Sequence, residues 1–274
     1  MSALDTAVSA AAEWPAPHAS VAVISADGAV AASFGEQDRR YRLASVTKPL
    51  SAYAFLVGIE EGALQLDQPA GPPGATVAHL LAHTAGYDFA SDAVRAAPGE
   101  RRLYSNTGFD TLGELLESET GISFGDYARE AVFEPLGMHT TEIGDSPAAG
   151  GWSTAADLSR FAAELQKPRL LAAETVAKAT SVAFEGRRGV LPGFGSQSPN
   201  DWGLGFEIRG EKSPHWTGAL NSPRTFGHFG QSGTFLWVDP DLGAGVVALT
   251  DRPFGEWAAT AWPGFSDGII RALR

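Results

Sequence analysis

A serine and a lysine stand three positions apart in Ser45-Val46-Thr47-Lys48, directly before an apolar run that begins at Pro49. If a helix begins here, the two side chains lie one turn apart on the same face. The helix dipole then favours negative charge on the serine oxygen, and a lysine in a dry pocket can lose its proton and act as a base. The same residues also fit a simple helix cap, because Ser45 or Thr47 can accept hydrogen bonds from helical amides.

Two later segments carry polar groups that suit the same site. Tyr104 and Asn106 stand on a short loop before a predicted helix, which places a phenol and an amide at its start. His228 lies in a glycine-rich segment, residues 227–233, that leads into an apolar strand, and such glycines let a substrate lie close to the backbone. Simpler interpretations are a half-buried loop tyrosine, an asparagine cap and a packed strand histidine. Because the three motifs occur together in this order along the chain, a shared site is the better interpretation.

Hydrophobic periodicity predicts the elements that would position these groups. Residues 49–64 are apolar on more than one face, which indicates a buried helix that ends near Gly62. Residues 20–24 and 29–33 predict a hairpin through an Asp-Gly turn, after an N-terminal helix over residues 4–12. The part from residue 65 to about 190 is mainly helical, with links rich in Gly and Pro and with predicted helices at 77–83, 107–119, 124–133 and 155–166.

Strand character returns after Trp202, with predicted strands at 203–208, 233–238 and 245–250 and a closing helix at 258–273. Strands at both ends around a helical middle predict an α+β (or α/β) fold, in which an antiparallel sheet built from both chain ends is flanked by helices. We therefore expect residues 1–64 plus 195–274 to form a sheet-and-helix domain. Residues 65–194 would form an inserted, mainly helical lobe.

The composition excludes several classes of protein. The 274 residues are 44% hydrophobic, which is enough to bury a full core, and they include no cysteine, so thiolate nucleophiles, cysteine zinc sites and disulfides are ruled out. We expect no cofactor and no metal. Thirty-two Asp and Glu outnumber 20 Lys and Arg, and an acidic surface disfavours nucleic acid and membranes as partners. The N-terminus shows no signal-like apolar run, which predicts a cytoplasmic protein.

Six segments in this order resemble the serine β-lactamase and penicillin-binding-protein-like superfamily, specifically its class C-like branch, which also contains esterases and D-amino-acid peptidases. The resemblance covers nearly the whole chain and implies a β-lactamase/transpeptidase-like fold. Its motifs are specific for the fold and much less specific for the substrate. They are residues 42–49 (RLASVTKP), 79–86 (HLLAHTAG), 104–108 (YSNTG), 133–138 (FEPLGM), 150–158 (GGWSTAADL) and 227–230 (GHFG).

The resemblance implies a role for each site residue. Ser45 would be the acylated nucleophile, Lys48 its proton partner, and Tyr104 the general base and later acid. Asn106 would bind Lys48 and the acyl side of the substrate. Whether Lys48 or Tyr104 takes the serine proton stays open, because a coupled pair can share the task. The substrate-binding strand would be His228-Phe229-Gly230, in the place of the family's Lys-Thr-Gly motif, and the N–H groups of Ser45 and Gln231 would form the oxyanion hole.

A second segment, His215-Trp216-Thr217-Gly218, also ends in Thr-Gly and is a rival for that strand motif. We prefer His228, because an apolar strand follows it directly. His and Phe here replace a lysine and a hydroxyl that commonly anchor a β-lactam carboxylate. A neutral imidazole anchors that group less well, unless Arg187, Arg188 or Arg224 reaches into the site. This departure favours an uncharged or less anionic acyl substrate.

The sequence therefore predicts a serine hydrolase, most simply an esterase for small carboxylic esters. A β-lactamase or a D-amino-acid peptidase would use the same site on a small-molecule ester or amide. A non-catalytic ligand-binding module of the same fold is the third alternative. The retained serine, lysine, tyrosine and asparagine disfavour it, because a pure binding protein needs no base. The oligomeric state stays open.

Overall fold

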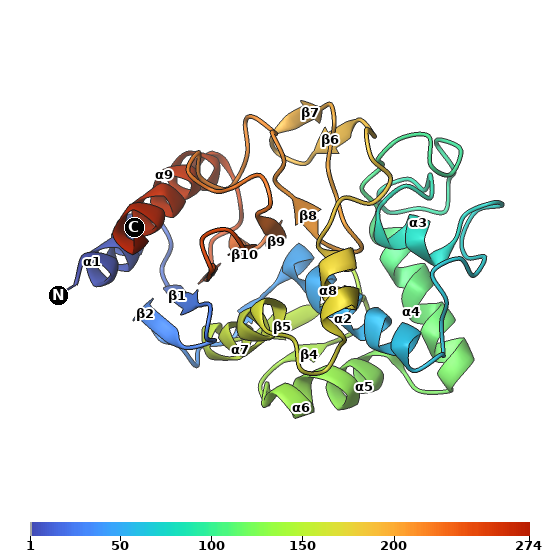
Figure 1. The fold of residues 1–274 in the computed structure, drawn as a ribbon, viewed down its shortest axis with the longest axis horizontal. Helices are drawn as coiled ribbons and strands as arrows, with labels where there is room; N and C mark the ends of the chain where they lie inside the picture. Colours follow the sequence, from blue (N-terminus) through green and yellow to red (C-terminus); the bar gives the residue numbers. More distant parts are fainter. Residues whose placement is uncertain (1) are drawn as a thin grey trace.

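A six-stranded antiparallel sheet forms the centre of the molecule in the computed structural model, which describes residues 2–274 (Figure 1). The strand order is β2-β1-β11-β10-β9-β8, so the N-terminal hairpin pairs directly with the last strand of the chain. This confirms the predicted sheet built from both chain ends. The strands are β1 (Ala19–Ser25), β2 (Val30–Phe34), β8 (Glu207–Ile208), β9 (Phe226–Gly230), β10 (Thr234–Asp239) and β11 (Ala244–Thr250).

Both faces of the sheet are covered, which explains why its central strands are apolar without interruption. Side chains alternate along β1: Val21 and Val23 face the terminal helices, whereas Ala22 and Ile24 face the larger core. The helices α1 (Ala3–Ser9) and α9 (Glu256–Leu273) lie together on the first side, as Figure 1 shows at its left. The opposite face packs against α7 (Ala155–Gln166).

A buried helix, α2 (Thr47–Glu60), runs through the larger core and carries the lysine of the first motif at its start. Nearly all of its side chains are buried, as its apolar pattern predicts, and Gly62 follows it in a left-handed conformation, with φ of 82°. Further helices surround it: α3 (Val77–Leu81), α4 (Asn106–Thr120), α5 (Phe124–Ala128), the π-helical turn at Arg129–Phe133, α6 (Glu134–Leu136) and α8 (Ala173–Ala179).

The structure contains short strands that the sequence does not predict, and helices of residues 65–194 share a core with the sheet. One continuous core joins residues of the sheet, such as Ile24 and Leu249, to residues of the middle segment, such as Phe109 and Leu158. The helix α7 belongs to this segment and yet covers the sheet. The additional strands are short: β3 (Tyr41–Arg42), β4 (Glu142–Ile143) and β5 (Gly151–Ser153) form one small sheet, and β6 (Gly189–Leu191) and β7 (Gly195–Gln197) form a hairpin.

The strand expected at 203–208 is limited to β8. Its first half forms other hydrogen bonds, because the amide of Leu204 donates to Ala179 and the amide of Gly205 donates to Leu81. Gly205 has φ of 91°, which directs the chain away from the sheet.

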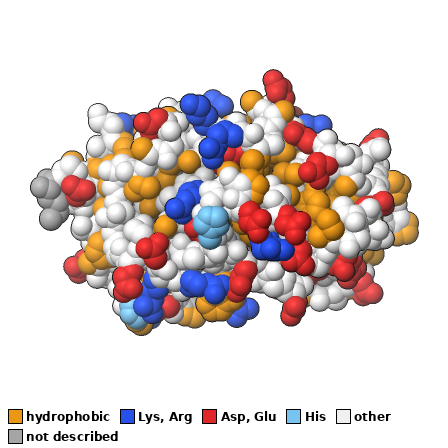
Figure 2. Space-filling model, turned by 90° about the horizontal axis from the view of Figure 1, so that it is seen from below, with side chains coloured by type: hydrophobic (Ala, Val, Ile, Leu, Met, Phe, Trp, Pro, Cys, Tyr) orange, Lys and Arg blue, Asp and Glu red, His pale blue; other side chains and the backbone are white. Residues whose placement is uncertain are grey.

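None of the helices in residues 2–274 combines the length and hydropathy needed to cross a bilayer. On the face shown in Figure 2, acidic and basic side chains lie interspersed among hydrophobic ones.

Candidate active site

Ser45 lies on a tight 3₁₀ turn (Ala44–Val46) that leads directly into α2. The preceding residue, Ala44, has a left-handed backbone with φ of 47°, a conformation that costs a non-glycine residue about 1 to 3 kcal/mol. Thr47 stabilises the turn, since its hydroxyl donates to the Ala44 carbonyl at 2.6 Å and accepts from the Gly151 amide at 2.9 Å. The N-cap residue of α2 is Val46, and neither Ser45 nor Thr47 accepts a hydrogen bond from an amide of this helix. The helix-cap interpretation of Ser45 and Thr47 is therefore wrong.

Lys48 is completely buried, and its amine has three oxygen partners. The Nζ atom lies 2.7 Å from Asn106 Oδ1, 3.0 Å from the Ala148 carbonyl and 3.5 Å from Ser45 Oγ. Burial lowers the pKa of Lys48 to about 7. A neutral amine has two N–H donors and one lone pair, so it can donate to Asn106 and Ala148 while it accepts the proton of Ser45. The geometry is that of a general base beside a nucleophile.

Asn106 is free to reach Lys48 because it does not cap its own helix. Ser105 is the N-cap of α4, and its hydroxyl accepts from the amide of Gly108 at 3.2 Å. On the next turn of α4, Asp110 lies 2.7 Å from the Ser146 hydroxyl and holds the loop that presents the Ala148 carbonyl. The start of α4 thus positions both oxygen acceptors of the lysine.

Tyr104 closes the other side of the serine. Its ring centroid lies 4.6 Å from Lys48 Nζ, its hydroxyl lies 3.3 Å from His228 Nε2, and Ser45 is near enough to lower the pKa of the phenol slightly against the effect of burial. Burial raises the pKa of the Tyr104 phenol well above its usual value, so the phenol keeps its proton at neutral pH. In this state Tyr104 is a proton donor, whereas Lys48 is the available acceptor.

His228 is a neutral imidazole at this site. Its Nδ1 atom lies 2.6 Å from the carbonyl oxygen of Phe229 and donates a proton to it, which leaves Nε2 as an acceptor for the Tyr104 hydroxyl. Burial and the nearby Lys48 lower the pKa of His228 to about 3. His228 therefore brings no positive charge to the site.

The strand β9 lies directly against the turn that carries the serine. A Cβ atom at Gly230 would collide with the carbonyl oxygen of Leu43, so only glycine permits this approach. Thr234 fixes the same contact from β10, because its hydroxyl donates to Leu43 at 2.9 Å. This close packing places Gln231, just after β9, beside Ser45 on one cavity wall.

The cavity at Ser45 is small, about 70 Å³, and mostly apolar or aromatic. The structure brings the predicted residues Ser45, Tyr104, His228, Phe229 and Gln231 to its wall, with Lys48 and Asn106 behind them; Gly230 contributes packing instead. The remaining lining residues were not predicted from the sequence. They are Phe89, Leu191, Pro192, Trp202 and Glu207.

Two further histidines support the site from behind. His83 has φ of 56°, accepts the Ser105 amide at 3.2 Å and packs its ring 4.6 Å from that of Tyr104. These contacts fix the loop that carries Tyr104, so the role of His83 is structural. His215, from the rival motif, lies outside the strand in a buried cluster, where Nε2 is 3.1 Å from the carboxylate of Glu207 and that carboxylate also pairs with Lys212.

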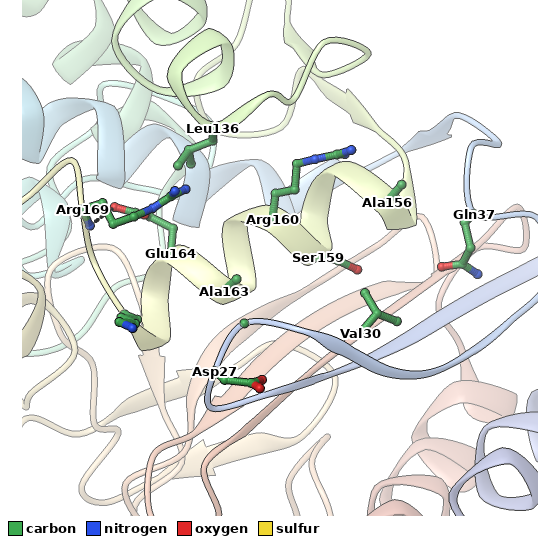
Figure 3. Close-up of a pocket in the computed structure, with 12 residues that line it drawn as sticks. Asp27, Val30, Gln37, Leu136, Ala156, Ser159, Arg160, Ala163, Glu164 and Arg169 are labelled. Atoms are coloured by element: carbon green, nitrogen blue, oxygen red, sulfur yellow. Dashed lines mark hydrogen bonds and ion pairs between the residues drawn. The ribbon is translucent and has the colours of Figure 1, made fainter.

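A larger cavity of about 690 Å³ lies elsewhere, between α7 and the turn of the β1–β2 hairpin (Figure 3). Figure 3 shows Asp27 on the hairpin and Arg160, Glu164 and Arg169 along and after α7. Its serine, Ser159, donates to the Ala155 carbonyl of its own helix at 2.7 Å. This cavity therefore offers no activated nucleophile, although it is about ten times larger than the one at Ser45.

The depressed pKa of Lys48 predicts how the reactivity of Ser45 depends on pH. Protonated lysine cannot accept the serine proton, so the rate of Ser45 labelling by a fluorophosphonate should rise about tenfold per pH unit below about 7 and then level off. Because the pKa of His228 is near 3 and that of Tyr104 is raised, neither contributes a step between pH 5 and 9. Circular dichroism over this range is the control for folding. A rate that is flat or falls with pH would contradict the assignment of Lys48.

Comparison with known proteins agrees with this geometry. The beta-lactamase family model matches residues 10–265. The crystal structure of a beta-lactamase from Mycobacterium bovis is 54% identical, with a TM-score of 0.96 over 97% of this chain and 99% of that one. EstCE1, a hydrolase with promiscuous acyltransferase activity, shares the fold at 20% identity, with a TM-score of 0.77 over 98% of this chain and 97% of that one.

Among curated proteins, penicillin-binding protein 4* of Bacillus subtilis is 29% identical over 136 residues, which are 38% of this chain and 30% of that protein. The chain spans less than half the length of the curated relatives it matches. The family model, by contrast, covers almost the whole chain, and it does so across the motifs that hold the serine, the lysine, the tyrosine and the histidine strand. The chain therefore belongs to the beta-lactamase family, within the superfamily of serine β-lactamases and penicillin-binding-protein-like hydrolases.

Proposed function

We propose that the protein is a serine hydrolase that cleaves small carboxylic esters through an acyl-enzyme on Ser45. The observation that carries this proposal is the hydroxyl of Ser45 between a buried amine of lowered pKa and a protonated phenol. Membership of a hydrolase family supports the reaction class.

Acylation begins when the Ser45 oxygen attacks the carbonyl carbon of the ester. Lys48 takes the serine proton, and the N–H groups of Ser45 and Gln231 stabilise the negative charge on the carbonyl oxygen. When the bond to the leaving group breaks, Tyr104 donates its proton to the departing alkoxide. The proton on Lys48 then restores the phenol, so the pair returns to its starting charge with the acyl group on Ser45.

Deacylation repeats these steps with water as the nucleophile. Water loses a proton to the same base as it attacks the acyl carbon, and Ser45 leaves with a proton from the lysine and tyrosine pair. The carboxylic acid product is released. His228 takes part by holding the phenol through Nε2, which stays an acceptor because Nδ1 donates to the Phe229 carbonyl.

The cavity supports an ester as the substrate. Its wall at the scissile bond is aromatic and apolar, its volume is about 70 Å³, and His228 adds no positive charge. A short, uncharged acyl group fits such a wall. EstCE1 shows that a hydrolase can share this fold.

A β-lactam is the second candidate substrate. The observation in its favour is the 54% identity to a crystal structure described as a beta-lactamase. A D-amino-acid peptidase would use the same serine, and D-alanyl-D-alanine carboxypeptidases are among the curated relatives. The neutral His228 and apolar Phe229 in the strand motif favour the ester.

An assay with two chromogenic substrates separates these functions. We expect kcat/KM for a para-nitrophenyl ester of a short acid to exceed that for a chromogenic cephalosporin by about tenfold or more, equivalent to roughly 1.4 kcal/mol in transition-state stabilisation. Ser45→Ala protein gives the background rate for both. Faster cephalosporin turnover would assign a β-lactamase instead. Turnover of neither substrate, together with no fluorophosphonate labelling, would indicate a binding module.

A further inference from the structure

A second cavity adjoins the one at Ser45 and has a different character. Its volume is about 590 Å³, and it shares the wall residues Phe89, Tyr104 and Pro192 with the smaller cavity. The tip of the β6–β7 hairpin contributes Pro192, so this hairpin borders both spaces. The two cavities are therefore neighbours that share the wall formed by these three residues.

Four arginines and a single aspartate line this second cavity, which we call the arginine cavity. The net charge of its wall is thus positive, whereas the whole chain has a net charge of -12. Arg102 is buried and donates to backbone carbonyls of Asn200, Ala82 and Ala183, so its hydrogen bonds are used within the fold. Its pKa falls to about 10, which leaves it positive at neutral pH.

The other three arginines differ in whether their guanidinium groups already have partners within the protein. Arg95 is paired with Asp88, at 2.8 Å and 3.0 Å from one carboxylate oxygen, and this pair neutralises the only acid of the wall. Arg101 donates to the Arg95 carbonyl at 3.0 Å, but its buried Nε has no partner. No ion pair joins Arg101 or Arg188 to a carboxylate anywhere in residues 2–274.

Unpaired guanidinium groups in a concave wall are suited to a carboxylate, which they bind through two parallel hydrogen bonds. The strand motif holds no cation, because His228 is neutral. Arg224, which could have supplied one, is paired with Asp241 at 2.7 Å. The arginine cavity therefore supplies positive groups next to the small cavity, where the strand motif supplies none.

We propose that the natural substrate carries a carboxylate away from its scissile bond, and that Arg101 and Arg188 bind this group in the arginine cavity. The proposal rests on the proposed function and names the substrate class, an anionic ester such as the half-ester of a dicarboxylic acid. It also revises the expectation of an uncharged substrate. In this proposal the part of the substrate near Ser45 is neutral, and its carboxylate lies farther from the scissile bond.

Two matched pairs of esters test the proposal. The first pair is mono-para-nitrophenyl glutarate and its methyl ester, which place a carboxylate or a neutral group on the acyl side. The second is para-acetoxybenzoate and its methyl ester, which place them on the leaving group. We expect wild-type kcat/KM to favour the carboxylate in at least one pair by about tenfold, and this preference to shrink as salt is added.

Arg188→Gln should remove most of that preference while it leaves turnover of the neutral ester unchanged. Its side chain is exposed, so the change does not disturb the core. Arg188→Lys should retain part of the preference, since it keeps the charge. Arg224→Gln is the matched control, because it removes an exposed arginine elsewhere and should change neither ester.

The outcomes separate this inference from the proposed function. Equal turnover of carboxylate and methyl esters in both pairs overturns the inference and leaves the esterase intact, as does an equal loss for both esters in Arg188→Gln. If no ester is hydrolysed, the esterase fails, and protection of Ser45 from fluorophosphonate by glutarate decides the inference instead. Protection in wild type that disappears in Arg188→Gln supports it. Absence of protection overturns it.

Discussion

Replacing Ser45 with alanine is expected to lower kcat by about 10³-fold or more while the fold stays intact. The side-chain oxygen forms the acyl bond, so its loss leaves only binding and oxyanion stabilisation, and residues of such a group act as a unit. The change removes one oxygen from a half-buried turn whose conformation Thr47 maintains independently, so we expect little change in thermal stability. Kinetics with the para-nitrophenyl ester, together with thermal unfolding, measure both quantities.

Ser159→Ala is the matched control for this variant, because it removes a serine that hydrogen-bonds only within α7. It should retain wild-type turnover. A fluorophosphonate should add a single adduct to wild type, which peptide mapping places on Ser45, and none to the alanine variant. Near-normal hydrolysis by Ser45→Ala, or a mapped adduct on another residue of an active preparation, would remove Ser45 from the mechanism.

The sequence predicts the long, periodic elements of the fold well, because their signals are local. The helix α7 has the predicted limits, β10 is shifted by one residue from its prediction, and β11 begins one residue earlier than predicted. The strands β3 to β7 were missed, since pieces of two or three residues carry no periodicity. The division into a sheet domain and a helical lobe follows chain order, whereas the core is continuous across it.

The candidate site, like the fold, could be predicted from the sequence only in part. Ser45, Lys48, Tyr104, Asn106 and His228 could be selected because their chemistry and order are visible in the chain. The Ala148 carbonyl could not, because any residue supplies a carbonyl and only the fold brings this one to Lys48. The sequence analysis names Arg188 as a possible anchor, but it does not reveal the arginine cavity, because only the fold brings Arg188 to the segment that carries Arg95, Arg101 and Arg102.

Lys48→Met is expected to lower kcat by about 10² to 10⁴-fold, the range that a positioned general base contributes. Methionine keeps most of the volume of the lysine in its dry site, so the core stays filled. It leaves Asn106 Oδ1 and the Ala148 carbonyl without their amine donor, which costs about 1 to 3 kcal/mol of stability for each buried group left unsatisfied. Thermal unfolding and kcat measured on the same preparation separate the two effects. Lys178→Met, at an exposed position on α8, should change neither.

The pH profile of the variant decides between the two possible bases. If Lys48 takes the serine proton, the step near pH 7 must disappear from the residual activity of Lys48→Met, because the group with that pKa is gone. The residual rate should then rise only toward the high pH at which the phenol of Tyr104 ionises, since burial raises that pKa. A variant that keeps kcat within about tenfold of wild type, together with the step near pH 7, would transfer the role of base to Tyr104 and reduce Lys48 to an electrostatic support.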